Sequence, residues 1–415
     1  MRIFFILILS IQYTLAKDYD FKSLYKVAQE RNPIIQDKEL ELKEIDSEIK
    51  SIKSDYYPKL HAIIGSEKRI APDEASVESN KAVGELRVDY NLYQFGATKK
   101  KLDALKEEQK QKKRLINFTQ EELKRSLMAL YFEVLSHKKH KELILEELKY
   151  NQKLKKQVQS KREQGLVGRA DVLEIEMREA TLKNTLLKVT EEYQHGLDKL
   201  RKLTFVSHNQ EINILGSLPH VHFSTSLSDL LESALKRNNE LLNINSKTLA
   251  LEYETDSSFS KRLPSLKLMG RYGRMRIDET YTSNDSQEGL VGLYLEIPLF
   301  DGGKRFSKQA INQARLERSK LKLKSTKHNL EIDLTHRFEK FQNIHKLLDL
   351  SETNLKKAKI YFNNVLSEYK RGVKNSLDLV SARDRLYQFQ LNVINYNKDY
   401  QDSKLELERL SGINL

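Results

Sequence analysis

The chain has 415 residues, of which 32% are charged and 39% are hydrophobic, with 15 Gly, 6 Pro and no Cys. The lack of cysteine excludes a disulfide framework and a thiolate metal site. The formal net charge of +13 permits contact with nucleic acid or anionic lipid, but charge alone does not determine a fold.

Residues 1–16 differ in composition from the rest of the chain. Arg2 precedes an apolar run at residues 3–9, and Ala16 ends a short stretch of small or short residues. The apolar run is far shorter than the roughly 20 residues that a transmembrane helix needs. We therefore predict a secretory signal peptide at residues 1–16 and a mature chain that begins near Lys17. Such a chain is periplasmic, extracellular or a β-barrel protein of an outer membrane.

Landmarks of the first half of the chain recur in the second half. Pro58 recurs as Pro264, displaced by 206 residues, and Gly165 recurs as Gly372, displaced by 207 residues. One inserted residue accounts for the difference, and ordered landmarks at a nearly constant displacement indicate a duplicated unit of about two hundred residues. The predicted organisation is a first repeat at residues 17–205, a linker at residues 206–225 and a second repeat at residues 226–415.

Each repeat is predicted to contain a helix, a pair of strands, a very long helix and a final helix. No Gly or Pro interrupts residues 97–164 or 304–371, and each interval is 68 residues long. A helix of that length would extend roughly 100 Å. Apolar residues then recur at heptad spacing in the final helix, as in a coiled coil. The predicted strand pairs are residues 58–70 with 82–93 and 264–277 with 289–298, the long helices are 97–164 and 302–371, and the final helices are 169–204 and 375–411.

The predicted strands alternate between apolar and polar residues. Leu86 and Val88 share one face, whereas Glu85, Arg87 and Asp89 share the other. Tyr and Phe residues gather near the strand ends. This pattern is typical of a membrane β-barrel with an apolar outer face, and a soluble hairpin shows the same alternation.

Two motifs carry a resemblance to a known family. Residues 297–305 read Ile-Pro-Leu-Phe-Asp-Gly-Gly-Lys-Arg, and residues 369–379 contain Gly372 and Asp378. With these motifs the chain resembles the TolC-like outer-membrane efflux proteins over nearly the whole mature sequence. The first repeat departs from the pattern, with Asn91 in place of the proline and Gln94-Phe95 in place of Asp-Gly.

The resemblance implies a mainly α fold with membrane β structure. Four strands per chain would contribute to a twelve-stranded β-barrel shared by a homotrimer, and the helices would form a long α-helical barrel. The implied function is a passive outer-membrane channel of a tripartite efflux or type I secretion system, without cofactors. Its implied partners are a periplasmic adaptor, an inner-membrane pump and outer-membrane lipid. The implied location is the outer membrane of a Gram-negative bacterium, extending into the periplasm.

Two sets of candidate site residues lie where the chain turns. Leaving a strand for a helix within two residues requires backbone angles that glycine reaches cheaply, and an aspartate can cap the helix. The candidate strand–helix junction residues are Pro298, Asp301, Gly302, Gly303 and Gly96. Glycine likewise permits a sharp turn between antiparallel helices, and the resemblance places the adaptor contact there. The candidate tip residues are Gly165, Leu166, Val167, Gly372 and Val373.

The resemblance also implies a gate just beyond the tips. Tyr369 and Lys374 would bond to carboxylates such as Asp171, and Asp378, repeated in three chains, would form a ring that attracts cations. The alternative is that Asp171 and Asp378 only cap the first turns of their helices.

No catalytic motif is present, so we do not expect an enzyme. The His137–His140 and His220–His222 pairs each lack a third ligand, so no metal site is assigned. The alternative function is an exported or cytoplasmic coiled-coil scaffold whose basic surface binds nucleic acid or membrane. Lysine-rich clusters favour this scaffold, whereas the predicted signal peptide and the predicted strand pairs argue against it. We therefore expect no nucleic acid partner. These clusters are residues 99–101, 110–114 and 320–324.

Overall fold

The structure is a computed structural model that describes residues 17–67, 81–207, 210, 212–218, 225–274 and 288–413. Outside these residues lie the predicted signal peptide and part of the predicted linker. So do residues 68–70 and 275–277, which are the last three residues of the strands predicted at 58–70 and 264–277. The chain divides into two compact units. Unit 1 comprises residues 1–36, 117–238 and 328–415, and unit 2 comprises residues 37–116 and 239–327.

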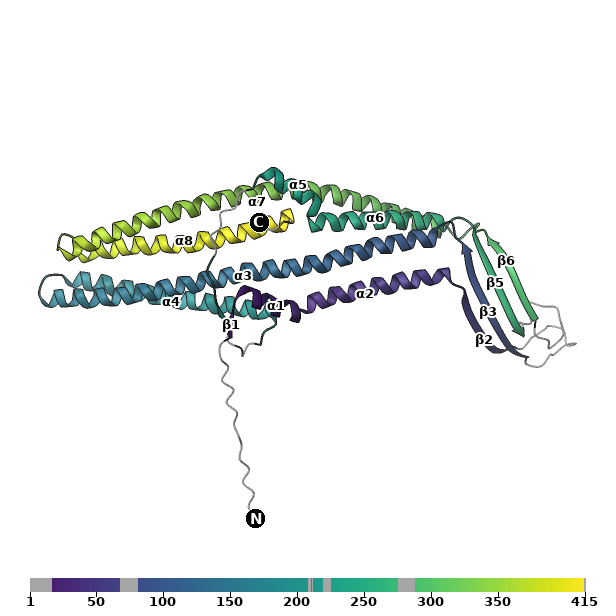
Figure 1. The fold of residues 1–415 in the computed structure, drawn as a ribbon, viewed down its shortest axis with the longest axis horizontal. Coiled ribbons are helices and arrows are strands. Elements are labelled where there is room, and N and C mark those ends of the chain that lie inside the picture. Colours follow the sequence, from purple (N-terminus) through teal and green to yellow (C-terminus); the bar gives the residue numbers. More distant parts are fainter. Residues whose placement is uncertain are drawn as a thin grey trace, which may run out of the picture. The chain divides into compact units, whose positions relative to one another are not determined.

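The elements follow the same order in both halves of the chain (Figure 1). The first half contains β1 (Lys17–Tyr19), α1 (Phe21–Arg31), α2 (Pro33–Lys53), a 3-10 turn (Ser54–Tyr56), β2 (Lys59–Glu67), β3 (Lys81–Tyr93), α3 (Ala97–Glu163) and α4 (Arg169–Thr204). The second half contains β4 (Ile212–Ile214), α5 (Leu227–Arg237), α6 (Asn239–Ser260), β5 (Ser265–Arg274), β6 (Glu288–Glu296), α7 (Lys304–Lys370) and α8 (Ser376–Ser411).

The single helix expected before each strand pair is in fact two helices. Asn32 is extended, as expected for a residue before proline, and its side chain accepts a hydrogen bond from the backbone N–H of Ile34 at 2.9 Å. Pro33 then opens α2 at the position where its missing N–H costs least. In the second half Asn238 makes the same break, and its amide donates to the carbonyl of Leu410 at 3.0 Å.

The sheet of unit 2 has four antiparallel strands in the order β2-β3-β5-β6 (Figure 1). Its register aligns Leu60, Val88, Gly270 and Val291 in one row across the sheet. The predicted alternation is therefore confirmed, because apolar residues of all four strands share a face. On that face Val291 is 78% exposed in the single chain. An exposed apolar face of this kind is typical of a surface that contacts a membrane or another protein.

The opposite face of the sheet carries the charged residues of β3 and β5 beside apolar residues such as Met269 and Leu290, and these charges are paired within the sheet. Arg87 Nε lies 3.1 Å from Asp89 Oδ2, and Arg271 Nε lies 4.0 Å from Glu85 Oε1. Glu85 is buried even though its side chain is a carboxylate. These pairs satisfy charges that would otherwise be costly beside an apolar sheet.

Unit 1 contains two helical hairpins, one formed by the C-terminal part of α3 with α4 and the other by that of α7 with α8 (Figure 1). Near the turns, buried residues of all four helices form one apolar cluster that includes Val158, Ile175, Val365 and Leu379. The predicted heptad positions thus meet in a core. Among the residues that the structure describes, no helix combines the length and the apolar character required of a membrane span.

The two-stranded parallel sheet of β1 and β4 was not predicted from the sequence. It pairs Lys17 with Ile212 and Tyr19 with Ile214, and β4 lies within the segment expected to be a linker. Tyr19 and Ile214 are buried in an apolar cluster with residues of α1, α3 and α4. Strands of three residues are too short for a periodic pattern to indicate them.

Gly196 provides a test of the packing between α3 and α4. A Cβ at this position would lie 2.7 Å from Val134 Cγ2, which is closer than carbon atoms approach. We expect Gly196→Val to destabilise unit 1 by about 1–3 kcal/mol through overpacking. Thermal unfolding followed by circular dichroism measures this loss. Gln194→Val, at an exposed position of the same helix, is the control for helix propensity; equal melting of the two variants would contradict the prediction.

Candidate functional site at the helical hairpin tips

Both hairpin tips use the same turn. Gly165 has φ +74° and Gly372 has φ +81°, each two residues beyond the last residue of a long helix. The N–H of Leu166 donates to the carbonyl of Lys161 and the N–H of Val373 donates to that of Glu368, both at 2.9 Å. This is the bonding pattern of a Schellman C-cap, which requires a left-handed residue and therefore favours glycine.

The apolar residues of the tips differ in exposure. Leu166 is 67% exposed and Val373 is 70% exposed, whereas Val167 packs against the apolar cluster of unit 1. Of these three apolar tip residues, Leu166 and Val373 are therefore the ones that the single chain exposes at its surface.

Asp171 and Asp378 occupy equivalent capping positions. Asp171 Oδ2 accepts from the backbone N–H of Gly168 at 3.2 Å, and Asp378 Oδ2 accepts from that of Asn375 at 3.3 Å. Each aspartate is thus the third residue of its helix. Asp378 completes a capping box, because the Asn375 side chain accepts from its backbone N–H at 2.8 Å, whereas Gly168 has no side chain with which to return the bond of Asp171. The capping role that the sequence left as an alternative is present at both positions.

The proposed gate residues have other contacts in the single chain. Asp171 Oδ1 accepts from the hydroxyl of Ser376 at 2.8 Å, which links the start of α4 to the start of α8. Tyr369 is buried beneath Lys161, whose Nζ lies 4.2 Å from the ring centroid. Lys374 is exposed. The sequence did not single out Ser376, because a serine at a helix start usually indicates only a cap.

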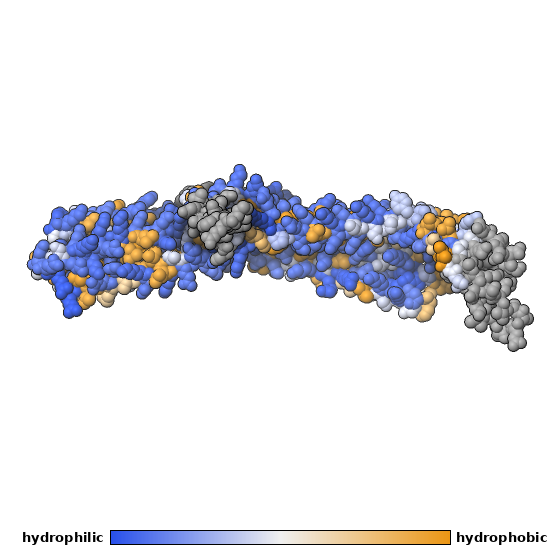
Figure 2. Space-filling view, turned by 90° about the horizontal axis from the view of Figure 1, so that it is seen from below, coloured by the Kyte–Doolittle hydropathy of each residue, from blue (hydrophilic) through white to orange (hydrophobic). Residues whose placement is uncertain are grey.

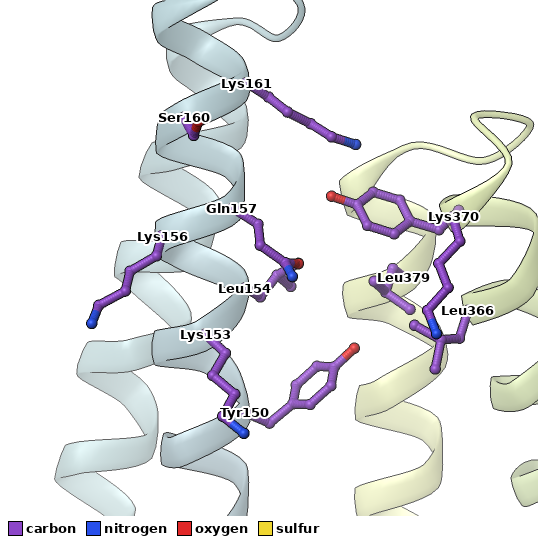
Figure 3. A pocket seen from close by; sticks show the side chains of 11 residues that line it. Tyr150, Lys153, Leu154, Lys156, Gln157, Ser160, Lys161, Leu366, Lys370 and Leu379 are labelled. Atoms are coloured by element: carbon purple, nitrogen blue, oxygen red, sulfur yellow. The ribbon is translucent and has the colours of Figure 1, made fainter.

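A groove of about 690 Å³ lies between α3 and α7, close to the tips (Figure 3). Its lining combines four lysines with five aromatic or apolar residues and two uncharged polar residues. The lining residues are Tyr150, Lys153, Leu154, Lys156, Gln157, Ser160, Lys161, Leu366, Tyr369, Lys370 and Leu379. Sequence analysis did not predict this groove, since its two walls are more than two hundred residues apart.

A buried ion network ties α3, α4 and α8 together farther from the tips. The side chain of Glu147 is fully buried; its Oε2 lies 3.2 Å from Arg178 Nη2 and its Oε1 lies 2.5 Å from Arg383 Nη2. Arg178 Nη2 also lies 2.7 Å from Asp384 Oδ1, and the Arg383 guanidinium lies 4.6 Å from the ring centroid of Tyr150. Removing the Glu147 carboxylate would leave the mostly buried guanidinium groups of Arg178 and Arg383 without the negative charge that both contact.

Comparison with known proteins identifies the family. The model described as outer membrane efflux protein matches residues 24–204 and 230–413. The chain belongs to the outer membrane efflux protein family. The match confirms the resemblance to TolC-like channels, places the protein in the outer membrane and makes it a channel protein, not an enzyme. A search of curated proteins by sequence gives no significant match.

Solved structures of low sequence identity share the fold. A membrane protein from Pseudomonas aeruginosa is 15% identical with a TM-score of 0.80, covering 97% of this chain and 92% of its own. The CmeC outer membrane channel of Campylobacter jejuni is 14% identical with a TM-score of 0.80, covering 94% and 85%. The outer membrane protein VceC of Vibrio cholerae is 16% identical with a TM-score of 0.80, covering 95% and 96%.

The strand–helix junctions of this outer membrane efflux protein are equivalent in backbone but not in sequence. Gly302 and Gly303 have φ +67° and +84°, and Phe95 and Gly96 have φ +49° and +76°. A phenylalanine therefore adopts the conformation that glycine adopts in the second repeat, with its ring 4.9 Å from that of Tyr93. This departure is the one that made the first junction harder to recognise.

The second junction is held by a charged pair. Asp301 Oδ2 accepts from the backbone N–H of Arg305 at 3.1 Å and from its Nε at 2.7 Å. The Arg305 guanidinium also donates to the carbonyl of Pro298 at 3.1 Å, beyond the end of β6. Strand β6 ends at Glu296, two residues before the predicted end at 298.

The lysine-rich clusters of the efflux protein contact acidic residues of neighbouring helices. Lys101 Nζ lies 2.6 Å from Glu254 Oε1, and Lys320 Nζ lies 3.7 Å from Glu252 Oε1. Lys112 pairs with Glu41. These contacts stabilise helix packing in unit 2. Because glutamates neutralise these three lysines, fewer positive charges remain for the nucleic acid binding considered above. The figure of the surface shows helices that are mostly hydrophilic on the drawn face (Figure 2).

His140 predicts an acid-sensitive contact between α3 and α8. Its Nε2 lies 3.0 Å from the hydroxyl of Tyr387, and His137 and Glu192 are the nearby titratable groups. Burial lowers the pKa of His140 from its ordinary value, so the folded protein binds its proton less readily than the unfolded chain does. The folded state is therefore favoured while His140 is neutral, at pH values above about 6.5. This stability is lost as the pH falls below the ordinary histidine pKa toward the lower pKa that His140 has in the folded protein.

Below about pH 6.5 we therefore expect the melting temperature of His140→Gln to fall less steeply with falling pH than that of wild type. Melting curves at a series of pH values measure it, with the exposed His328→Gln as control. Identical pH profiles for His140→Gln and wild type would contradict the prediction.

Proposed function

We propose that three copies of this protein form a passive outer-membrane conduit of a tripartite efflux or type I secretion system. An inner-membrane pump supplies the energy, and a periplasmic adaptor joins the pump to the conduit. Family membership supports export, and the open sheet of unit 2 is the observation that carries the assembly.

The sheet favours a homotrimer because its outer strands, β2 and β6, have unpaired edges among the residues that the structure describes. In lipid, backbone groups at an open edge have no water with which to bond, so membrane sheets close into barrels. Four strands are too few to close around a pore. Three copies joined edge to edge would supply twelve strands, with the exposed apolar face toward lipid.

The tips are the proposed adaptor contact. Gly165 and Gly372 allow the sharp turns, and Leu166 and Val373 are exposed apolar side chains at the ends of both hairpins. Val167 supports the turn from inside, because it packs against the core.

The proposed gate consists of Asp171, Tyr369, Lys374 and Asp378. In a trimer three copies of Asp378 would form an acidic ring that binds cations, in addition to capping α8. Asp378→Asn separates the two roles, because an amide oxygen can still cap the helix while the charge is lost. We expect both Asp378→Asn and Asp378→Ala to weaken block by multivalent cations by about tenfold.

Single-channel recording in planar bilayers measures this block. In the same recordings Tyr369→Phe combined with Lys374→Ser is expected to raise conductance by loosening the closed end. If Asp378→Asn retains wild-type block, the aspartate is a helix cap and the ring is absent.

Deletion of the gene tests the function in the cell. We expect the deletion strain to retain efflux substrates such as dyes and antibiotics, or to lose secreted polypeptides from the medium. Restoration by the wild-type gene is the control. Retention of small compounds indicates tripartite efflux, and loss of secreted polypeptides indicates type I secretion. A deletion that changes neither would contradict the proposal.

A further inference from the structure

The helices of unit 2 lie in the same order as the strands to which they lead (Figure 1). Helix α2 packs on α3, α3 contacts α6, and α6 contacts α7. The last contact includes a hydrogen bond of 2.6 Å from the Asn312 amide of α7 to the Ser258 hydroxyl of α6. Helices α2 and α7 are thus the outer helices of this layer, just as β2 and β6 are the outer strands. If β6 of one copy pairs with β2 of the next, α7 of the first comes beside α2 of the second.

One flank of α7 in unit 2 carries a row of exposed cations. The five residues are spaced by four, seven, three and four positions, which keeps them on one side of the helix. The members of this cationic row are Lys304, Lys308, Arg315, Arg318 and Lys322, and all are exposed. With the residues that the structure describes, none of the five forms an ion pair, unlike Lys320 on another side of α7, whose Nζ lies 3.7 Å from Glu252 Oε1.

One flank of α2 carries a row of carboxylates. These residues are spaced by four, three and four positions, again on one side of a helix. The members of this acidic row are Asp37, Glu41, Glu44 and Glu48. Glu41 pairs with Lys112 of α3, and Asp37 Oδ2 lies 3.2 Å from Lys38 Nζ. Glu44 and Glu48 are exposed and form no ion pair with the described part of the chain.

Both rows come to the same surface when α2 of one copy lies beside α7 of another. Seen from the N-terminus of its own helix, each row lies roughly 80–100° counterclockwise of the face that packs within the chain, at about 100° per residue. Helix α2 leads toward the sheet and α7 leads away from it, so the two would be antiparallel. Their packed faces would also point in opposite directions. The two reversals cancel, and the two rows meet on one surface of the helical layer.

The rows also match along the helix axis. Helix α2 ends at Lys53, just before β2, and α7 begins at Lys304, just after β6. Counting from these two ends brings three cations within one helical turn of a carboxylate: Lys308 with Glu48, Arg315 with Glu44, and Arg318 with Asp37. Leu40 of α2 is 57% exposed and Leu321 of α7 is 67% exposed, both opposite the packed faces. The same contact would cover these two leucines.

From these observations we infer that the cationic row of α7 pairs with the acidic row of α2 from a second copy of the chain. The contact rests on the proposed trimer, continues the pairing of β6 with β2, and adds the charges that select the partner surface. Cations meet carboxylates only when α7 faces α2. Two α7 helices, or two α2 helices, would bring like charges together, so the rows permit head-to-tail rings and oppose symmetric dimers.

The test reverses each row separately and then both together. The variants are Lys308→Glu/Arg315→Glu/Arg318→Glu, Asp37→Lys/Glu44→Lys/Glu48→Lys, and the combination of all six changes. Native mass spectrometry in detergent over a series of protein concentrations measures the concentration at which half of the protein is trimeric. We expect each single-row reversal to raise this midpoint by at least about tenfold, because like charges then face each other at every contact between copies. The combined variant should return to within about threefold of wild type, because the signs match again.

The matched control is Lys113→Glu/Lys324→Glu/Lys327→Glu, which reverses three exposed lysines elsewhere on the helices of unit 2 and changes the net charge as the first variant does. Its midpoint should stay near that of wild type. A control weakened as much as the first variant, or a combined variant no better than the single-row reversals, would overturn the inference. So would single-row reversals that leave the midpoint unchanged and alter only the ion selectivity in planar bilayers, since the rows would then line the pore unpaired.

The wild-type protein separates this inference from the proposed function. A wild-type trimer that is indifferent to both single-row reversals would count against the charge pairing alone. A wild-type protein that stays monomeric at every concentration would count against the trimeric conduit itself.

Discussion

Replacing Glu147 with alanine is expected to destabilise the helical hairpins by about 3–5 kcal/mol, since it removes the partner of two buried guanidinium groups. Glu147 is fully buried, and Arg178 and Arg383 both contact its carboxylate. In a unit of this size the loss corresponds to a fall of about 10 °C in melting temperature. Circular dichroism of the purified protein measures it.

The adjacent Glu146→Ala is the matched control, because Glu146 is exposed on the same turn of α3. A second variant distinguishes lost pairing from lost volume: Glu147→Met/Arg178→Met/Arg383→Met removes all three charges, and we expect it to recover most of the stability. If Glu147→Ala melts like Glu146→Ala, the network does not contribute as described.

Replacing both tip glycines with valine is expected to abolish export while leaving the trimer assembled. A Cβ at Gly165 or Gly372 meets no atom within 4 Å, so neither substitution causes a clash in the chain. Both glycines have positive φ, however, and a β-branched residue is a clear outlier in that region. The turn must therefore change shape, and with it the surface offered to the adaptor.

Export in the complemented deletion strain, and the trimer on native gels, measure the two effects. Asparagine tolerates the left-handed conformation, so Gly165→Asn/Gly372→Asn is the control that adds a side chain with less strain. Export at the wild-type level in the valine variant would remove the tips from the adaptor contact.

The sequence was sufficient to predict elements whose signal is long or repeated. The heptad positions of α4 and α8 and the alternation of the strands each extend over many residues, and Gly165 and Gly372 mark both tips. The break before Pro33 was also open to prediction, since the residue before a proline avoids the helical region. The β1–β4 pair was not, because two strands of three residues contain no periodic signal.

The candidate site was only partly open to prediction, because much of it depends on which helices become neighbours. A signal for the ion network did exist: Glu147 falls among Ile144, Leu148 and Asn151 on a buried face, and a charge in such a seam requires a partner. Nothing in the sequence indicated that Ser376 would bond to Asp171, since that contact joins residues 205 apart. The groove, likewise, exists only once α3 and α7 are packed.

The mass of the assembly in its native membrane tests the central claim most directly. We would fractionate cells, solubilise the outer membrane and measure the purified protein by native mass spectrometry. The account predicts an outer-membrane protein with three times the mass of the mature chain, because the four-stranded sheet has two open edges. A monomer recovered from the soluble fraction would contradict it.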